Sequence, residues 1–159
     1  MKINTSQKPF IPGGWTVESH DTLGEIDLKD IELYLDPEQS KGIEGNKLRK
    51  KLKDKKVLNA VVLDYLLSHQ DLIPEEWKGR YVYFWGTIYR NSNGYLCVRY
   101  LVWYGSEWNW DYNWLGSDWN GHNPAASLAS NPKSSENESL ENRISELEKF
   151  REKVEKVIN

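Results

Sequence analysis

A single cysteine, Cys97, is present in the sequence, so no disulfide can form within the chain, and this scarcity is typical of proteins from a reducing compartment. The sequence also lacks an apolar run of membrane-spanning length, and its opening residues, MKINTSQKPFIPGGW, lack the apolar segment of a secretion signal. Hydrophobic residues make up only 38% of the chain, which is low for a sequence that is folded throughout. These shortages predict a cytoplasmic protein that has no membrane association and whose chain lies partly outside a core.

Signatures of catalysis are missing as well. The histidines His20, His69 and His122 share no spacing suited to a metal, and the sequence has no H-E-x-x-H, C-x-x-C, P-loop or G-x-S-x-G motif. Asp111, Asp118 and His122 do lie near one another, which leaves open a small hydrolase or metal-dependent enzyme. The same polar residues are typical of a turn, so we expect no catalytic residue, no metal and no cofactor.

The net charge of −3 is too small to indicate a nucleic-acid-binding protein, although one segment is strongly basic. Residues 46–56 contain seven Lys or Arg residues and one Asp. On a helix these charges would surround the axis, and no aromatic residues lie among them. The segment is therefore more typical of a solvated helix than of a phosphate-binding site.

What the sequence has in abundance is aromatic residues, and these follow an alternation of period two. Three strands are predicted, over residues 81–90, 95–104 and 107–115. Asn93-Gly94 separates the first two strands, and Gly105-Ser106 separates the last two; both pairs favour tight hairpin turns. The pattern predicts an antiparallel meander.

Register arithmetic from Gly105-Ser106 assigns the side chains of this meander to two faces, because opposed residues in an antiparallel pair share a face. An even-numbered loop is assumed at residues 91–94. Face A then consists of Val82, Phe84, Ile88, Cys97, Arg99, Leu101, Trp103, Trp108, Trp110, Tyr112 and Trp114. Face B consists of Tyr81, Tyr83, Trp85, Tyr89, Leu96, Val98, Tyr100, Val102, Tyr104, Glu107, Asn109, Asp111 and Asn113.

Face A is apolar apart from Arg99, so we expect its tryptophans, Trp108, Trp110 and Trp114, to be packed in a core rather than to form a ligand platform. Face B is rich in tyrosine, an amphipathic residue that binding surfaces favour. Amino-terminal strands, a second subunit or a ligand could each cover it.

Helical periodicity precedes the meander. Residues 46–53 place two leucines four apart with Asn46 as the expected N-cap, and residues 57–69 carry a broad apolar stripe. The two helices are expected to form a hairpin that covers face A. Further upstream, residues 15–19 and 25–35 favour strands.

The predicted organisation of the whole chain follows from these elements. It consists of a flexible arm over residues 1–14, an α+β globular domain over residues 15–120, a small-residue linker over residues 121–138 and a C-terminal helix over residues 139–159.

The C-terminal helix has a heptad pattern, interrupted by Arg151, that indicates self-association as a dimer or trimer. RISELE, residues 143–148, resembles a short pattern associated with trimeric coiled coils. A helix folded back on the domain is the alternative. The expected oligomerisation residues are Leu140, Arg143, Ile144, Leu147, Glu148, Val154 and Ile158.

Four stretches, GNKLRKKL, VLNAVVLDYLLSHQDLIPEEWKG, FWGTIYRNSNGYLCVRYLVW and WNWDYNWLGSDWNGHNPAASLAS, resemble segments of a family of small uncharacterised bacterial proteins. The resemblance spans about residues 42–130 and implies a bacterial or mobile-element setting. It implies no activity and no functional residue.

The sequence therefore predicts an α+β fold in which an antiparallel Trp/Tyr-rich meander packs on a helical hairpin, followed by a coiled-coil-like helix. The expected function is non-catalytic interaction with itself and with a protein partner of unknown identity. The expected partner contacts are Tyr81, Tyr83, Trp85, Tyr89 and Trp119. A carbohydrate-binding module using the aromatic residues around Trp119 is the alternative.

Overall fold

The alternating aromatic segment forms two long antiparallel strands, β8 (Leu96–Trp103) and β9 (Trp108–Trp114). The structure is a computed structural model that describes residues 1–129. The register is the predicted one, with Trp103 opposite Trp108 and Cys97 opposite Trp114. It is set by a tight turn, in which the amide of Tyr104 donates to the carbonyl of Glu107 at 3.0 Å.

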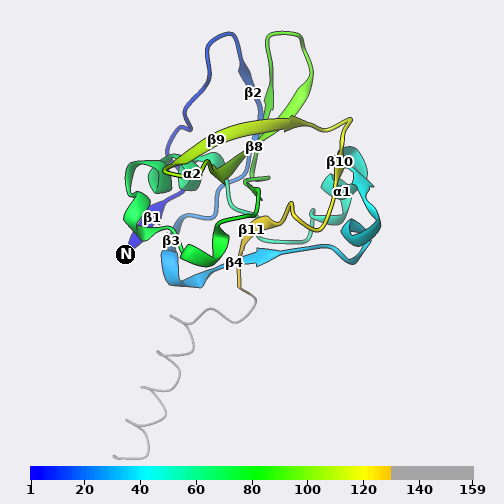
Figure 1. The fold of residues 1–159 in the computed structure, drawn as a ribbon. Coiled ribbons are helices and arrows are strands. Elements are labelled where there is room, and N and C mark those ends of the chain that lie inside the picture. Colours follow the sequence, from blue (N-terminus) through cyan, green and yellow to red (C-terminus); the bar gives the residue numbers. More distant parts are fainter. Residues whose placement is uncertain (130–159) are drawn as a thin grey trace, which may run out of the picture.

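These two strands belong to a larger curled sheet (Figure 1). Among residues 1–129 its strand order is β2-β7-β8-β6-β11-β4, with β9 paired to β8, and two small sheets join β1 to β3 and β5 to β10. The other strands are β1 (Lys2–Asn4), β2 (Thr16–His20), β3 (Glu25–Asp27), β4 (Ile31–Tyr34), β5 (Ile43–Glu44), β6 (Val82–Tyr83), β7 (Thr87–Arg90), β10 (Asp118–Trp119) and β11 (Ala125–Leu128). The mixed α and β content of the prediction is confirmed, but the sheet is larger than a three-stranded meander.

The strand predicted over residues 81–90 is interrupted at Gly86, which separates β6 from β7. The amide of Gly86 donates to the carbonyl of Leu58 at 2.9 Å, outside the main sheet ladder. A Cβ atom at position 86 would lie 2.8 Å from the backbone of Asn59. Only glycine permits this approach, and it ends the strand.

The connection between β7 and β8 is longer than assumed, and it places each β7 side chain on the face opposite to the predicted one. Arg90 pairs with Leu96, so five residues connect β7 to β8 and the assumed even-numbered loop is wrong. Tyr89 pairs with Cys97 and therefore lies on face A, whereas Ile88 packs with the face B residues. The face assignments of Val82 and Tyr83 hold, because they pair with Leu101 and Tyr100.

The helices α1 (Gly45–Lys51) and α2 (Ala60–Ser68) cover opposite sides of the sheet and lie far apart in Figure 1. Leu63 of α2 belongs to the face A core, and Leu48 of α1 belongs to the face B core. The predicted helical hairpin is therefore wrong. The chain between the helices runs beside the interior strand β11, where Val57 forms a bridge with Ser127 and the amide of Leu58 donates to the carbonyl of Ala126 at 2.9 Å.

Both helices begin at a side-chain N-cap, but the predicted cap, Asn46, is wrong. Asn59 caps α2, accepting from the amide of Val61 at 3.1 Å. The N-cap of α1 is Glu44 rather than Asn46, because the helix begins at Gly45, two residues earlier than an N-cap at Asn46 implies. Within residues 1–129, short 3-10 turns complete the helical content, at Leu28–Asp30, Pro37–Lys41, Gln70–Leu72 and Glu75–Trp77. The first of these divides the strand predicted over residues 25–35 into β3 and β4.

Both predicted irregular regions contain strands. Within the arm over residues 1–14, β1 pairs with β3 and the side chain of Ile3 is buried. Within the linker over residues 121–138, β11 pairs with β4 and also, in parallel, with β6. Small side chains such as Ala126 suit a strand that is covered on both sides, and this is why the segment resembles a linker in sequence.

The predicted core tryptophans differ in burial. Trp108 is buried, Trp110 is half-buried against the face A core, and Trp114 at the end of β9 is exposed. The expected oligomerisation residues, 139–159, lie outside the described residues. No helix in the described part of the chain is long and apolar enough to cross a membrane.

Candidate functional site

The structure separates the five predicted partner contacts. Tyr83, Trp85 and Trp119 lie in the face B core, and Tyr89 is buried on face A. Only Tyr81, with 44% of its surface accessible, is exposed. Contact with a partner stays a prediction for these residues, but Tyr81 alone among them lies on the surface.

The three residues in the face B core, Tyr83, Trp85 and Trp119, pack their rings together under α1. Trp119 lies 5.2 Å from the ring of Tyr83 and 5.0 Å from that of Trp85, measured between centroids. Gly45 in α1 allows this packing, because a Cβ atom there would lie 2.5 Å from the carbonyl oxygen of Leu115 and would also collide with the Trp119 ring. The close approach of helix and ring indicates a structural role for Trp119, so the carbohydrate-binding loop predicted around it lacks an exposed indole.

A different set of tyrosines remains on the surface of face B. Tyr81 lies 5.2 Å from the ring of Tyr100, and the hydroxyl of Tyr104 donates to Asp111 Oδ2 at 3.3 Å. Tyr100 stands directly opposite Asp111 in the β8–β9 register. We call these four residues the tyrosine surface. The tyrosines were placed on face B by the sequence pattern, but the pattern did not distinguish exposed from buried ones.

The electrostatics of the tyrosine surface are negative. Burial, together with the neighbouring Asp111 carboxylate, raises the pKa of Tyr100 to about 12. The same two causes raise the pKa of Tyr104 above its ordinary value. The phenol groups therefore stay protonated at neutral pH. Among residues 1–129 neither Asp111 nor the nearby Glu107 forms an ion pair, so their negative charge is not compensated there.

At the free edge of β9, two backbone amides are already hydrogen-bonded to side chains. Hydrogen bonds at both ends of the β8–β9 ladder imply that the amides of Tyr112 and Trp114 point away from β8. Asp111 Oδ1 accepts from the first amide at 2.8 Å, and Asn113 Oδ1 accepts from the second at 3.0 Å. The alternation of Asn and Asp with aromatic residues thus protects an edge strand from further pairing. A partner is expected to contact the face of the sheet rather than this edge.

Arg99, the only charged residue of face A, is neutralised inside the protein. Its side chain is 1% exposed and forms an ion pair with Asp64 at 3.0 Å, while the Tyr89 hydroxyl lies 3.3 Å away. The guanidinium carbon lies 4.3 Å from the ring centroid of Trp110. Phe10 closes the site, because its amide donates to Asp64 at 2.8 Å. These contacts indicate a structural role for Arg99.

The residues of the predicted enzyme alternative do not form a closed site. Asp118 and His122 are exposed, and Asp111 is engaged by Tyr104 and Tyr112. The described part of the chain holds no group of three or more His, Cys, Asp and Glu residues that could bind a metal. Burial raises the pKa of Cys97 to about 11, which keeps this thiol protonated and unreactive.

The fold and these contacts define a class: an α+β protein with a mixed sheet and an exposed tyrosine-rich surface. Comparison with models of protein families, with curated protein sequences and with solved structures gave no match to this chain.

Proposed function

We propose that the protein is a non-catalytic interaction module whose tyrosine surface binds a basic side chain of a protein partner. One observation carries the proposal: Tyr100 and Tyr104 adjoin a carboxylate, Asp111, that forms no ion pair with residues 1–129, and Tyr81 packs beside Tyr100. Aromatic faces attract Arg and Lys through cation–π contacts, and a carboxylate next to them adds charge-assisted hydrogen bonds. The chemistry of the surface favours a cationic group over an anionic one.

The mode of docking follows from the geometry of β9. Since the outward amides of Tyr112 and Trp114 donate to the side chains of Asp111 and Asn113, addition of a partner strand there is disfavoured. Tyr81 and Tyr104 offer large rings that lose little conformational entropy on binding. These features support recognition of side chains rather than of backbone.

The proposal is tested by titrating the labelled protein with a short arginine-containing peptide and with its glutamine-substituted counterpart, followed by NMR. We expect the arginine peptide to shift the signals of Tyr81 and Tyr104 and the glutamine peptide to leave them unchanged. Asp111→Asn should lower the affinity for the arginine peptide by about tenfold, which is the effect of losing one charge-assisted contact. Asp118→Asn, which removes an exposed carboxylate elsewhere, is the matched control. Equal responses to both peptides would refute the proposal.

A carbohydrate ligand is the second candidate, and one observation favours it. Asn109 and Asn113 share face B with Tyr100, so amides and rings lie on one surface. Saturable binding of a neutral oligosaccharide such as maltoheptaose, unchanged by Asp111→Asn but lost with Tyr100→Ala, would replace the first proposal. A thermal denaturation curve of Tyr100→Ala would control for loss of the fold.

Self-association through residues 139–159 is a further part of the proposal, resting on the heptad pattern in the sequence. Light scattering on the full chain should give the mass of a dimer or trimer. The double variant Ile144→Lys/Leu147→Lys should give a monomer, because charges in the seam oppose association. A monomeric mass for the unmodified chain would refute this part.

A further inference from the structure

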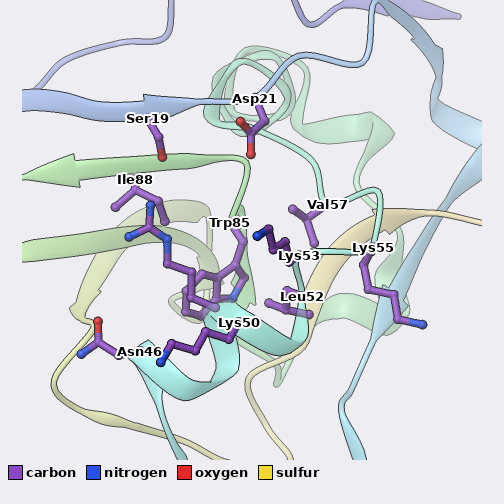
Figure 2. Close-up of a pocket in the computed structure, with 11 residues that line it drawn as sticks. Ser19, Asp21, Asn46, Lys50, Leu52, Lys53, Lys55, Val57, Trp85 and Ile88 are labelled. Carbon is purple, nitrogen blue, oxygen red and sulfur yellow. The ribbon is translucent and has the colours of Figure 1, made fainter.

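A cavity of about 500 Å³ lies between α1 and the region where β2 runs beside β7, away from the tyrosine surface (Figure 2). Its volume is within the range of pockets that bind small molecules. Lys50 and Lys53 lie on either side of Trp85 in Figure 2, and Arg49 and Lys55 complete the basic lining. The Lys55 side chain extends away from Trp85, with its Nζ 4.7 Å from the ring centroid of Tyr34. The cavity is therefore both concave and strongly cationic.

The charges of this cavity are unbalanced. Four of its lining residues are Lys or Arg, and Asp21 is the single acid among them. Within residues 1–129 Arg49, Lys50 and Lys53 form no ion pair and no side-chain hydrogen bond. Lys51, which points away from the cavity, is paired with Glu38 at 2.9 Å. Three cations without an ion pair in the described residues, two on α1 and one just after it, thus line the hollow, where they repel one another unless an anion binds.

The floor of the cavity is apolar and aromatic. Trp85 is 4% exposed, and Leu52, Val57 and Ile88 line the cavity beside it. The Nε1 atom of Trp85 is buried and has no hydrogen-bond acceptor in the described part of the chain. A cationic rim above an aromatic floor suits a ligand that has an anionic group at one end and a flat or apolar group at the other.

We propose that this cavity binds a small phosphorylated organic molecule. Lys50, Lys53 and Arg49 hold the phosphate groups, as ammonium and guanidinium groups do in phosphate sites, and the organic part packs on Trp85. The proposal does not depend on the function proposed for the tyrosine surface. It also revises the meaning of the basic segment, because four of its seven Lys and Arg residues line one cavity.

The test uses the full chain, with pyrophosphate and ADP as probes, in isothermal titration calorimetry at low salt. We expect saturable binding of one molecule of either probe per chain, with ADP bound more tightly because its base can pack on Trp85. The double variant Lys50→Gln/Lys53→Gln should lower the affinity for both probes by about tenfold or more, because each change removes a charged contact to phosphate. Both side chains are exposed, so the fold should survive.

The matched control is Lys47→Gln/Lys56→Gln, which removes the same charge from the same segment but outside the cavity lining. This pair should leave the affinity within about twofold of the original, since screened charges at the surface contribute little. Equal weakening by the two double variants, or no saturable binding of either probe, would overturn the proposal. Tighter binding of a twelve-nucleotide single strand than of ADP, weakened equally by both pairs, would also overturn it and indicate a nucleic-acid surface instead.

Discussion

The two sides of β8 differ in how completely they are closed. On face A, α2 and the amino-terminal residues cover the strands, and even the buried Arg99 is paired with Asp64 at 3.0 Å. On face B, α1 covers Tyr83 and Trp85 but leaves a basic cavity on one side and the tyrosine surface on the other. The same sheet therefore has one face that is closed by helix and chain and one face that is only partly covered.

The cause of this difference lies in the two helices. α2 has the sequence AVVLDYLLS, with five of its nine residues buried, whereas α1 has the sequence GNKLRKK, with only Gly45 and Leu48 buried. A short helix with one buried leucine cannot cover as much apolar surface as α2 does. Four predictions test this contrast.

The largest expected effect on stability comes from truncating one buried leucine on each face of the sheet. Leu63→Ala in α2 should lower the free energy of unfolding by about 4 kcal/mol, because its site is closed on every side. Leu52→Ala should cost about 2 kcal/mol, since Leu52 adjoins the cavity and its loss leaves less new void. Urea unfolding followed by tryptophan fluorescence measures both. Equal losses would show that the two faces are packed alike.

The next effect concerns the ion pair of face A. Asp64→Ala should destabilise the protein by about 3 kcal/mol, because it leaves the Arg99 charge buried without a partner. Arg99→Met should lower the free energy of unfolding by less, since Asp64 is partly exposed and water can solvate its charge. Thermal and urea unfolding of both variants test this order. Asp71→Ala, an exposed acid, should change stability by no more than about 0.5 kcal/mol. A larger loss for Arg99→Met would contradict the argument.

A smaller effect is expected at the contact between α1 and the face B rings. Gly45→Ala should cost about 2 kcal/mol, because the added methyl group meets the ring of Trp119 and the backbone of Leu115. Gly116→Ala is the control, since a Cβ atom there meets nothing within 4 Å. If both variants unfold at the same urea concentration, α1 does not pack on Trp119 as closely as described.

The smallest expected effect on stability at neutral pH comes from the buried thiol of Cys97. Burial raises the pKa of its thiol from 9.0 to about 11, so the unfolded chain loses this proton at a lower pH than the folded chain does. Stability from this group is therefore present below pH 9 and is lost between about pH 9 and pH 11. The difference in unfolding free energy between the original chain and Cys97→Ala should shrink over that interval. A disulfide reagent should react with the native thiol at pH 8 far more slowly than with the unfolded chain.

Prediction from sequence succeeded where the determinants are local. The turn at Gly105-Ser106 and the alternation around it specified the β8–β9 register residue by residue. The helices were found for the same reason, although the N-cap of α1 was misplaced by two residues. At the candidate site, the pattern placed the tyrosines on face B but could not show which of them other segments would cover.

Prediction failed where distant segments meet. The break at Gly86 depends on the backbone of Asn59, and β11 depends on two strands, β4 and β6, that lie far from it in sequence. The cavity is a product of the same kind of contact, because α1 and the residues just after it supply the basic side chains, whereas the segment between β6 and β7 supplies Trp85.

The amino-acid order alone was enough to settle which residues are neighbours across β8 and β9, because a two-residue turn and a period of two leave one register that keeps the apolar side chains together. Tertiary contacts alone decided which side of the sheet each helix covers, which tyrosines stay in contact with water and where the basic residues gather. Those outcomes depend on close backbone approaches between segments that are remote in the chain, and a local pattern carries no information about such approaches.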